Sequence, residues 1–371
     1  MDIDKSNLRL IVMDNISEFG NLVDYHLKES KGINENESFI VPIDCPRFAN
    51  GESKVEIKET IRAKDVYILS DVTNYDCTYK MHGFINHKSP DDHYQDIKRV
   101  ISAMDGAADS VTVVMPFLYE SRQHKRKGRE SRDCSVMLHE LEFMGVKSII
   151  TFDAHDPSVS NALHCCSFDN IYPTYSILKD FIEKEEVNLE NLLVVSPDAG
   201  AVDRAIYYAD MLGTDVGIYH KRRDYSKIVD GKNVIVAHEY MGADVKDKDV
   251  IVVDDIIASG QSILDVAEEL KKRGAKKIYL ITSFALFSDG ERSLKKFNDA
   301  YDRKVFHKMY TTNLFYMSQE TKYLEWLEIA DCSKYLARII ESLNSHNALS
   351  PLLNNKIKIL AKMNEVRSNE E

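Results

Sequence analysis

Short runs of β-favouring apolar residues alternate with segments of helical period along most of the chain. The runs that predict buried strands cover residues 8–13, 66–69, 111–115, 148–152, 192–196, 216–219, 234–237, 250–253 and 278–282. Between them, segments such as 17–28, 97–104, 136–144 and 175–183 repeat their apolar residues at helical spacing. Strands that alternate with helices build parallel sheets with helices on both faces. The pattern therefore predicts an α/β fold with doubly wound, mostly parallel sheets.

The pattern restarts after Pro157, and 371 residues exceed what a single core usually supports. We therefore expect two domains, residues 1–165 and 166–322. A helical tail, residues 323–371, should pack back on the N-terminal domain. Residues 74–92 are polar and show no clear period, so we expect an irregular insertion there without a metal site.

The run from Val250 to Ser262 predicts a strand buried on both faces, a short turn and a helix. Asp254 and Asp255 follow the strand, at the edge where open α/β sheets bind ligands. Ser262 and Asp265 have the spacing of a capping box. The turn should present free N–H groups at a positive helix end, which suits a phosphate. An ordinary turn with two solvated acids would show the same pattern.

Two further polar segments lie in the first half of the chain. Phe48 shares a Gly-containing turn with Asn50 and Glu52, so that a ring can stack on a base beside an amide that can read its edge. A plain hairpin turn would have the same composition. Arg122 and Gln123 begin the most basic run of the chain, residues 122–132, just past the strand-stopping Pro116. Anion binding is its natural use, although most of its charges would also suit a solvated loop.

Three other positions carry candidate chemistry. Asp153 and His155 stand two residues apart after a strand and could hold Mg²⁺ through carboxylate and water, although a buried histidine is an alternative for His155. Asp198 opens a helix, where a capping role is the more common one. Lys221 and Arg223 cluster past the predicted end of a strand.

Charge and cysteine usage limit the class of protein. Lys and Arg number 48 against 60 Asp and Glu, and this net charge of −12 disfavours general binding to nucleic acid or to anionic membranes. The six Cys form no CxxC pair and are expected to be reduced thiols of a cytoplasmic protein. The first residues lack a basic start and an apolar core, and no apolar run approaches membrane-spanning length.

In order and spacing, these motifs resemble those of the ribose-phosphate diphosphokinases, or phosphoribosyl pyrophosphate (PRPP) synthetases. The turn at 254–262 alone resembles a motif that this family shares with the type I phosphoribosyltransferases. The resemblance implies two phosphoribosyltransferase-like domains. It further implies that ATP is bound by Phe48, Asn50, Glu52, Arg122 and Gln123, and that Mg²⁺ is held by Asp153 and His155. The implied catalytic residues are Lys221 and Arg223, in a flexible loop. The implied ribose 5-phosphate site consists of Asp198, Asp254, Asp255, Ala258, Ser259, Gly260, Gln261 and Ser262.

The implied reaction joins ATP and ribose 5-phosphate into PRPP and AMP for nucleotide biosynthesis. The implied assembly is a homo-oligomer built from dimers, with a hexamer as one form, in which the Phe48 turn reaches a neighbouring subunit's site. Ala258, Gln261 and His124 depart from the family's usual residues. Two alternatives stay open: a phosphoribosyltransferase, which would need a base-binding hood and no ATP turn, and a non-catalytic regulatory homologue.

Overall fold

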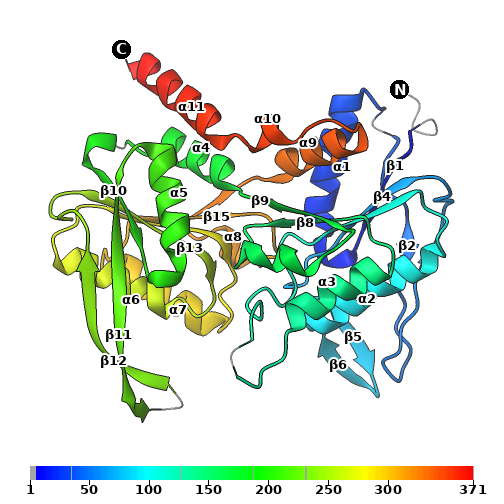
Figure 1. Ribbon diagram of the computed structural model, residues 1–371, viewed down its shortest axis with the longest axis horizontal. Helices are drawn as coiled ribbons and strands as arrows, with labels where there is room; N and C mark the ends of the chain where they lie inside the picture. The colour runs from blue at the N-terminus through cyan, green and yellow to red at the C-terminus, as the bar shows by residue number, and fades with distance from the viewer. Residues whose placement is uncertain (1–5, 35, 127, 187, 230–231, 371) are drawn as a thin grey trace. The chain divides into compact units, whose positions relative to one another are not determined.

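The chain divides into two units in the computed structural model (Figure 1). The first consists of Met1–Pro173, Asn313–Met317 and Asp331–Leu353, and the second of Thr174–Thr312, Ser318–Ala330 and Asn354–Glu371. The structure describes residues 6–34, 36–126, 128–186, 188–229 and 232–370; the side chains of 220–239 and 366–370 lie outside this description. Among the described residues, no helix combines the length and the apolar character needed to cross a membrane.

The first unit is built on a five-stranded parallel sheet in the order β1-β4-β7-β8-β9. Its strands are Leu8–Val12, Asp65–Leu69, Ser110–Val114, Ser148–Phe152 and Ser167–Ile171. Helices α2 (Pro90–Met104) and α3 (Asp133–Phe143) pack their apolar residues against one face of this sheet. Helices α1 (Ser17–Lys31) and α9 (Ser333–Asn344) pack together on the other side, as Figure 1 shows.

The second unit is built on a seven-stranded sheet in the order β12-β11-β10-β13-β14-β15-β16. Its strands are Lys232–Met241, Asp215–Val229, Leu192–Ser196, Asp249–Ile257, Ile278–Ala285, Lys308–Thr312 and Leu327–Ala330. All neighbouring strands are parallel except β11 and β12, which form an antiparallel ribbon. The prediction of two mostly parallel α/β sheets is therefore confirmed.

Helices cover both faces of the second sheet (Figure 1). On one face, α4 (Thr174–Lys184), α5 (Val202–Leu212) and α11 (Asn355–Glu370) share a buried apolar cluster with β10, β13 and β14. Helices α6 (Gln261–Lys272) and α7 (Glu291–Asp302) lie on the other face. The short helix α8 covers Gln319–Lys322.

The division of the chain differs from the expected boundaries at 165/166 and 322/323. Strand β9 extends the first unit to Pro173, because it pairs in register with β8. The C-terminal segment is shared: α9 and α10 (Ser350–Leu353) belong to the first unit, whereas α11 packs against α4 and α5 of the second.

The segment 74–92 is more regular than its sequence suggested. It holds a two-stranded hairpin, β5 (Thr78–Met81) and β6 (Phe84–His87), which Figure 1 shows as a separate arm of the first unit. His82 and Gly83 at its turn have φ values of 48° and 85°, as a tight two-residue hairpin turn requires. Helix α2 then begins at Pro90, earlier than predicted, because Ser89 and Asp92 form a capping box.

Candidate active site

Strand β13 lies in the middle of the second sheet and carries the acidic pair. It pairs in parallel with β10 on one side and with β14 on the other. Its residues from Val250 to Val253 are buried, as the unbroken apolar run predicted. Asp254 and Asp255 do not follow the strand, as the apolar run predicted, but lie within β13, which pairs with β14 as far as Ile257. They still lie in its carboxyl-terminal half, toward the edge at which such sheets bind ligands.

The two carboxylates lie close together, with Asp254 half-buried and Asp255 buried. Asp255 is only 4% exposed, and its backbone N–H donates to Asp254 Oδ1 over 3.0 Å. Burial and then the neighbouring charge of Asp255 raise the pKa of Asp254 well above its ordinary value. The guanidinium of Arg204, 3.8 Å from Asp255 Oδ1, acts in the opposite direction. A ligand that donates hydrogen bonds to these carboxylates would therefore stabilise their ionised form.

The turn from Ala258 to Ser262 uses its carbonyls and leaves its N–H groups available. The carbonyl oxygens of Ala258 and Gly260 accept bonds from the N–H groups of Ser288 and Leu264, over 2.9 and 3.1 Å. In the described part of the chain, the N–H groups from Ala258 to Ser262 donate no hydrogen bond. Such a row of N–H groups at a helix start can bind an anion.

The predicted capping box at Ser262 and Asp265 is wrong. Helix α6 begins at Gln261, so Ser262 lies within its first turn, and Gly260 is the N-cap residue. Asp265 instead accepts a hydrogen bond from the side chain of Gln261 over 2.7 Å. Because none of the described side chains caps α6, its first N–H groups remain open to a ligand.

Gly260 fits this turn for two reasons. Its φ of 78° lies in the left-handed region that favours glycine. A Cβ there would also stand 2.2 Å from Cε2 of Phe297, which is buried in α7. The ring of Phe297 in turn stacks on Trp326, with centroids 5.5 Å apart. An aromatic cluster thus packs directly behind the turn.

Asp198 lies beyond the end of β10, next to the acidic pair. Its Oδ1 accepts hydrogen bonds from the N–H groups of Gly200 and Ala201, over 2.8 and 3.3 Å, so the expected capping role is present. Its charge also contributes to the raised pKa of Asp254, after burial and Asp255. The second unit therefore brings Asp198, Asp254 and Asp255 to one edge of its sheet.

Arg204 is a site residue that the sequence analysis missed. It lies in the first turn of α5, where the positive end of the helix disfavours a cation. That unfavourable position, close after Asp198 in sequence, was the signal that could have identified it as a partner for carboxylates.

The Phe48 turn of the first unit is a hairpin with an exposed ring. The N–H of Phe48 donates to the carbonyl of Glu52 over 2.7 Å, and the Phe48 ring is 51% exposed. The Asn50 amide donates to Glu52 Oε2 over 2.7 Å. The turn therefore presents a stacking ring beside a paired amide and carboxylate, although part of the Asn50 hydrogen-bonding capacity is already used.

The basic run leaves β7 through an irregular segment. Arg122 is exposed, whereas Gln123 is half-buried and donates from Nε2 to the carbonyl of Ser131 over 2.8 Å, which closes the base of this run. His124 packs its ring 5.3 Å from that of His155 and pairs with Asp156 over 3.3 Å when protonated. The run therefore reaches the segment that follows β8.

Asp153 and His155 fit a hard cation only as part of a larger ligand set. Asp153 is buried, with φ at 44°, and His155 is exposed. The side chains that the structure describes include no group of three or more His, Cys, Asp or Glu placed to hold a metal ion. Mg²⁺ keeps several waters and binds through few protein groups plus substrate phosphates, so a carboxylate and an imidazole suit it in that form.

Lys221 and Arg223 do not follow a strand end. Their backbone lies within β11, opposite β12, and their side chains lie outside the described residues. The apolar pattern predicts a shorter strand because polar residues interrupt its apolar run. An antiparallel ribbon pairs through its backbone and tolerates such residues.

A central parallel strand that carries paired carboxylates in its carboxyl-terminal half and leads into an N–H-rich turn defines an α/β protein of the phosphoribosyltransferase class. Residues 171–320 match the family model of the phosphoribosyl transferase domain. Residues 9–145 match the model of the N-terminal domain of ribose phosphate pyrophosphokinase.

Individual relatives define the family. A ribose-phosphate pyrophosphokinase of Ralstonia nicotianae is 31% identical over 247 residues, 66% of this chain and 70% of the relative. One from Haemophilus influenzae is 28% identical over 312 residues, 83% of this chain and 90% of the relative. The phosphoribosylpyrophosphate synthetase structure from Mycobacterium smegmatis has this fold, with a TM-score of 0.73 and 21% identity over 92% of this chain and 100% of that one. The chain belongs to the ribose-phosphate pyrophosphokinase family.

Proposed function

We propose that this protein transfers the diphosphoryl group of ATP to the 1-hydroxyl of ribose 5-phosphate, giving PRPP and AMP. The observation that carries the proposal is the carboxyl-terminal half of β13, where the half-buried Asp254 and the buried Asp255 adjoin a turn whose N–H groups have no partner in the described structure. A sugar phosphate matches both parts: its vicinal hydroxyls donate to carboxylates, and its phosphate accepts from N–H groups.

Each part of the second unit has a proposed role. Asp254 and Asp255 accept hydrogen bonds from the ribose diol, and residues from Ala258 to Ser262 bind the 5-phosphate. Asp198 adds an acid at the same edge. Arg204 limits the repulsion between the carboxylates and keeps them able to accept.

The chemical step needs positioning and charge neutralisation. The ribose 1-hydroxyl attacks the β-phosphorus of ATP, the bond from that phosphorus to the α-phosphate oxygen breaks, and AMP leaves. Phe48, Asn50, Glu52, Arg122 and Gln123 are the proposed ATP-binding residues, and Lys221 and Arg223 the proposed catalytic cations. Asp153 and His155 are the proposed protein ligands of Mg²⁺, which when bound neutralises charge on the phosphates.

The test is a direct assay. Purified protein is incubated with ATP, Mg²⁺ and ribose 5-phosphate, and AMP and PRPP are measured together. We expect both in equal amounts, and we expect Lys221→Ala to lower kcat about 10³-fold, the typical effect of removing a transition-state cation. A second assay supplies PRPP and a free base. Consumption of PRPP there would instead identify a phosphoribosyltransferase, and no turnover in either assay would indicate a regulatory homologue.

Location and assembly belong to the same proposal. We place the protein in the cytoplasm, in keeping with the reduced thiols expected from its cysteine usage. The family relationship supports a homo-oligomer assembled from dimers, in which the Phe48 turn serves a neighbouring subunit.

A further inference from the structure

The hairpin β5–β6 has no role in the reaction proposed above, yet it packs closely against the Phe48 turn. The N–H of His82, at the tip of the hairpin, donates to the carbonyl of Ala49 over 2.8 Å. A Cβ on Gly51 would stand 2.6 Å from Sδ of Met81, so the turn lies directly on this side chain. The hairpin therefore contacts the turn through two neighbouring residues, Met81 and His82.

Arg47, the residue before Phe48, connects the turn to both the hairpin and helix α2. Its side chain is 9% exposed, and its guanidinium lies 4.5 Å from the centre of the Tyr79 ring in β5. The same guanidinium donates to the carbonyl of Gly51 over 3.1 Å and lies 3.2 Å from Asp92 in α2. Arg47 thus connects the carbonyl of Gly51 within the turn to Tyr79 and Asp92, which lie outside it.

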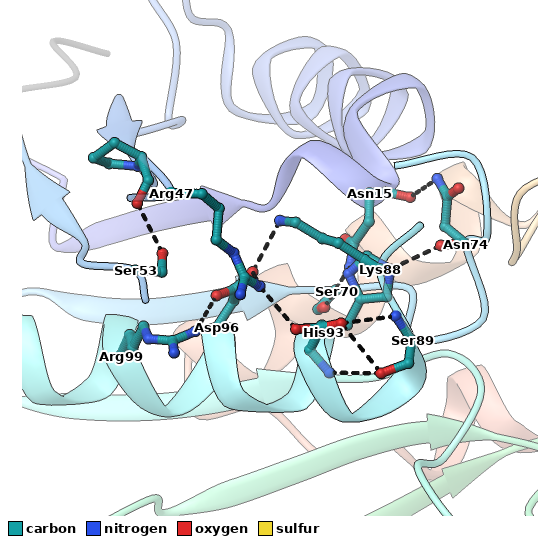
Figure 2. A network of polar contacts seen from close by, with 12 residues as sticks. Asn15, Arg47, Ser53, Ser70, Asn74, Lys88, Ser89, His93, Asp96 and Arg99 are labelled. Atoms are coloured by element: carbon teal, nitrogen blue, oxygen red, sulfur yellow. Dashed lines mark hydrogen bonds and ion pairs between the residues drawn. The ribbon is translucent and has the colours of Figure 1, made fainter. Parts of the chain in front are cut away.

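Asp96 is the anion on which this arrangement depends. It is 1% exposed, and Figure 2 shows Arg47, Lys88 and Arg99 converging on it. Their nitrogens lie 3.5, 2.9 and 2.6 Å from its carboxylate oxygens. Burial alone would raise the pKa of Asp96, but the bond from Lys88 and the charges of Lys88 and Arg47 outweigh it, so the net pKa lies below the ordinary value. The carboxylate is therefore ionised and holds three cations at once.

Both ends of the hairpin segment are anchored in the same network (Figure 2). At its C-terminal end, Lys88 reaches Asp96 through its side chain, and its N–H donates to the carbonyl of Cys77 over 2.8 Å. At its N-terminal end, the carbonyl of Asn74 lies 2.7 Å from Nε2 of the buried His93, and the Asn74 amide donates to the carbonyl of Asn15 over 2.8 Å. Because these contacts fix both ends of the hairpin, its tip is held in place against the Phe48 turn.

We propose that the hairpin β5–β6 and the Asp96 network position the Phe48 turn for the base of ATP, with Arg47 as the connecting residue. This inference rests on the proposed function in one respect, namely that Phe48 stacks on the base. Arg47, Tyr79 and Asp96 are positioning residues: they act through the turn and do not touch the reacting groups. Holding the turn in advance lowers the ordering cost of base binding, whereas binding of the phosphates is unaffected.

The test compares two ligands that differ only in the nucleoside. Dissociation constants of ATP and of inorganic tripolyphosphate are measured by calorimetry on the full-length protein with Mg²⁺. For Asp96→Asn we expect ATP to bind about tenfold more weakly, a loss comparable to one base–aromatic stack, and tripolyphosphate to bind as before. Lys98→Gln is the matched control. Lys98 lies in α2, as Asp96 does, but its ion pair is with Glu140 of α3, away from the turn.

A milder pair of variants keeps the test decisive if Asp96→Asn folds poorly. Tyr79→Leu removes the ring under Arg47 and should weaken ATP binding about threefold, whereas Tyr79→Phe keeps the ring and should restore wild-type affinity. Equal weakening of both ligands, or no change in ATP affinity, would overturn the inference, as would a wild-type protein that binds ATP no better than tripolyphosphate. A wild-type protein that shows the base preference but forms no AMP would refute the proposed reaction and leave this inference standing.

Discussion

Asp254 is the residue whose protonation should control sugar binding. Because its pKa is raised, the carboxyl keeps its proton at pH values where an ordinary aspartate is ionised, and a protonated carboxyl accepts less well from the ribose diol. We therefore expect the affinity for ribose 5-phosphate to rise with pH, by up to about tenfold per unit below that pKa. Calorimetry across a pH series measures this.

The variant Asp254→Asn isolates this effect from the ionisation of the sugar phosphate, which both proteins share. Its affinity should be lower and should show a correspondingly smaller rise with pH. The same pH slope in both proteins would exclude Asp254 as the titrating group.

Asp71 leads to a prediction about stability in the first unit. It is fully buried, and burial raises its pKa to about 6, although bonds from Thr73 and Tyr316 oppose this. Between about pH 4 and 6 the folded state then binds more protons than the unfolded state, so the free energy of unfolding falls as pH rises, by up to about 3 kcal/mol. Asp71→Asn should remove this fall, which urea denaturation at several pH values detects. An unchanged pH dependence would contradict the assignment.

At the scale of single elements, the turn between β13 and α6 can be tested through its contact with α7. Gly260→Ala places a methyl group against Phe297 at positive φ, and we expect it to lower the free energy of unfolding by about 2–4 kcal/mol. In a Phe297→Leu background the same substitution should cost less, because the clash is smaller. Denaturant titration of the full double-mutant cycle measures this coupling, and strictly additive effects would mean that the contact does not constrain the turn.

The sequence predicted well those elements whose burial produces a clear pattern of apolar residues. The strand of β13 follows from an unbroken apolar run, and the turn after it follows from adjacent acids and a glycine. The hairpin β5–β6 was missed because strands of four residues give too short an alternation, and its contacts with the Phe48 turn are not local in sequence. The Asp96 network had one local signal: a charged residue on the apolar face of α2, one turn before Val100.

The antiparallel pairing of β11 with β12 also depends on more than local pattern. Charged residues in the middle of β11 conceal its length, and the pairing register includes irregular steps. Backbone pairing at a sheet edge can continue where side-chain periodicity ends. This is why the apolar pattern placed Lys221 and Arg223 past the end of a strand.

For the whole molecule, the family relationship predicts that subunits share active sites. Phe48→Ala and Lys221→Ala should each be nearly inactive, and a mixture that has exchanged subunits should regain activity through hybrid sites. The matched control mixes Lys221→Ala with Asp255→Asn, whose substitutions both lie in the second unit. That mixture should stay inactive. Complementation in neither mixture, or in both, would argue against a Phe48 turn that serves another chain.

The aromatic cluster behind Gly260 gives the molecule a built-in optical probe. Trp326 is the only tryptophan of the chain, it is 2% exposed, and it stacks on the ring that packs against the turn. Its indole N–H donates to Asn298 in the same helix as Phe297. Ordering of the turn around a phosphate should therefore change the emission intensity of the indole without any label. A titration with ribose 5-phosphate followed at the tryptophan band would report occupancy of this one site, whereas occupancy of the Phe48 turn by nucleotide would leave the signal unchanged.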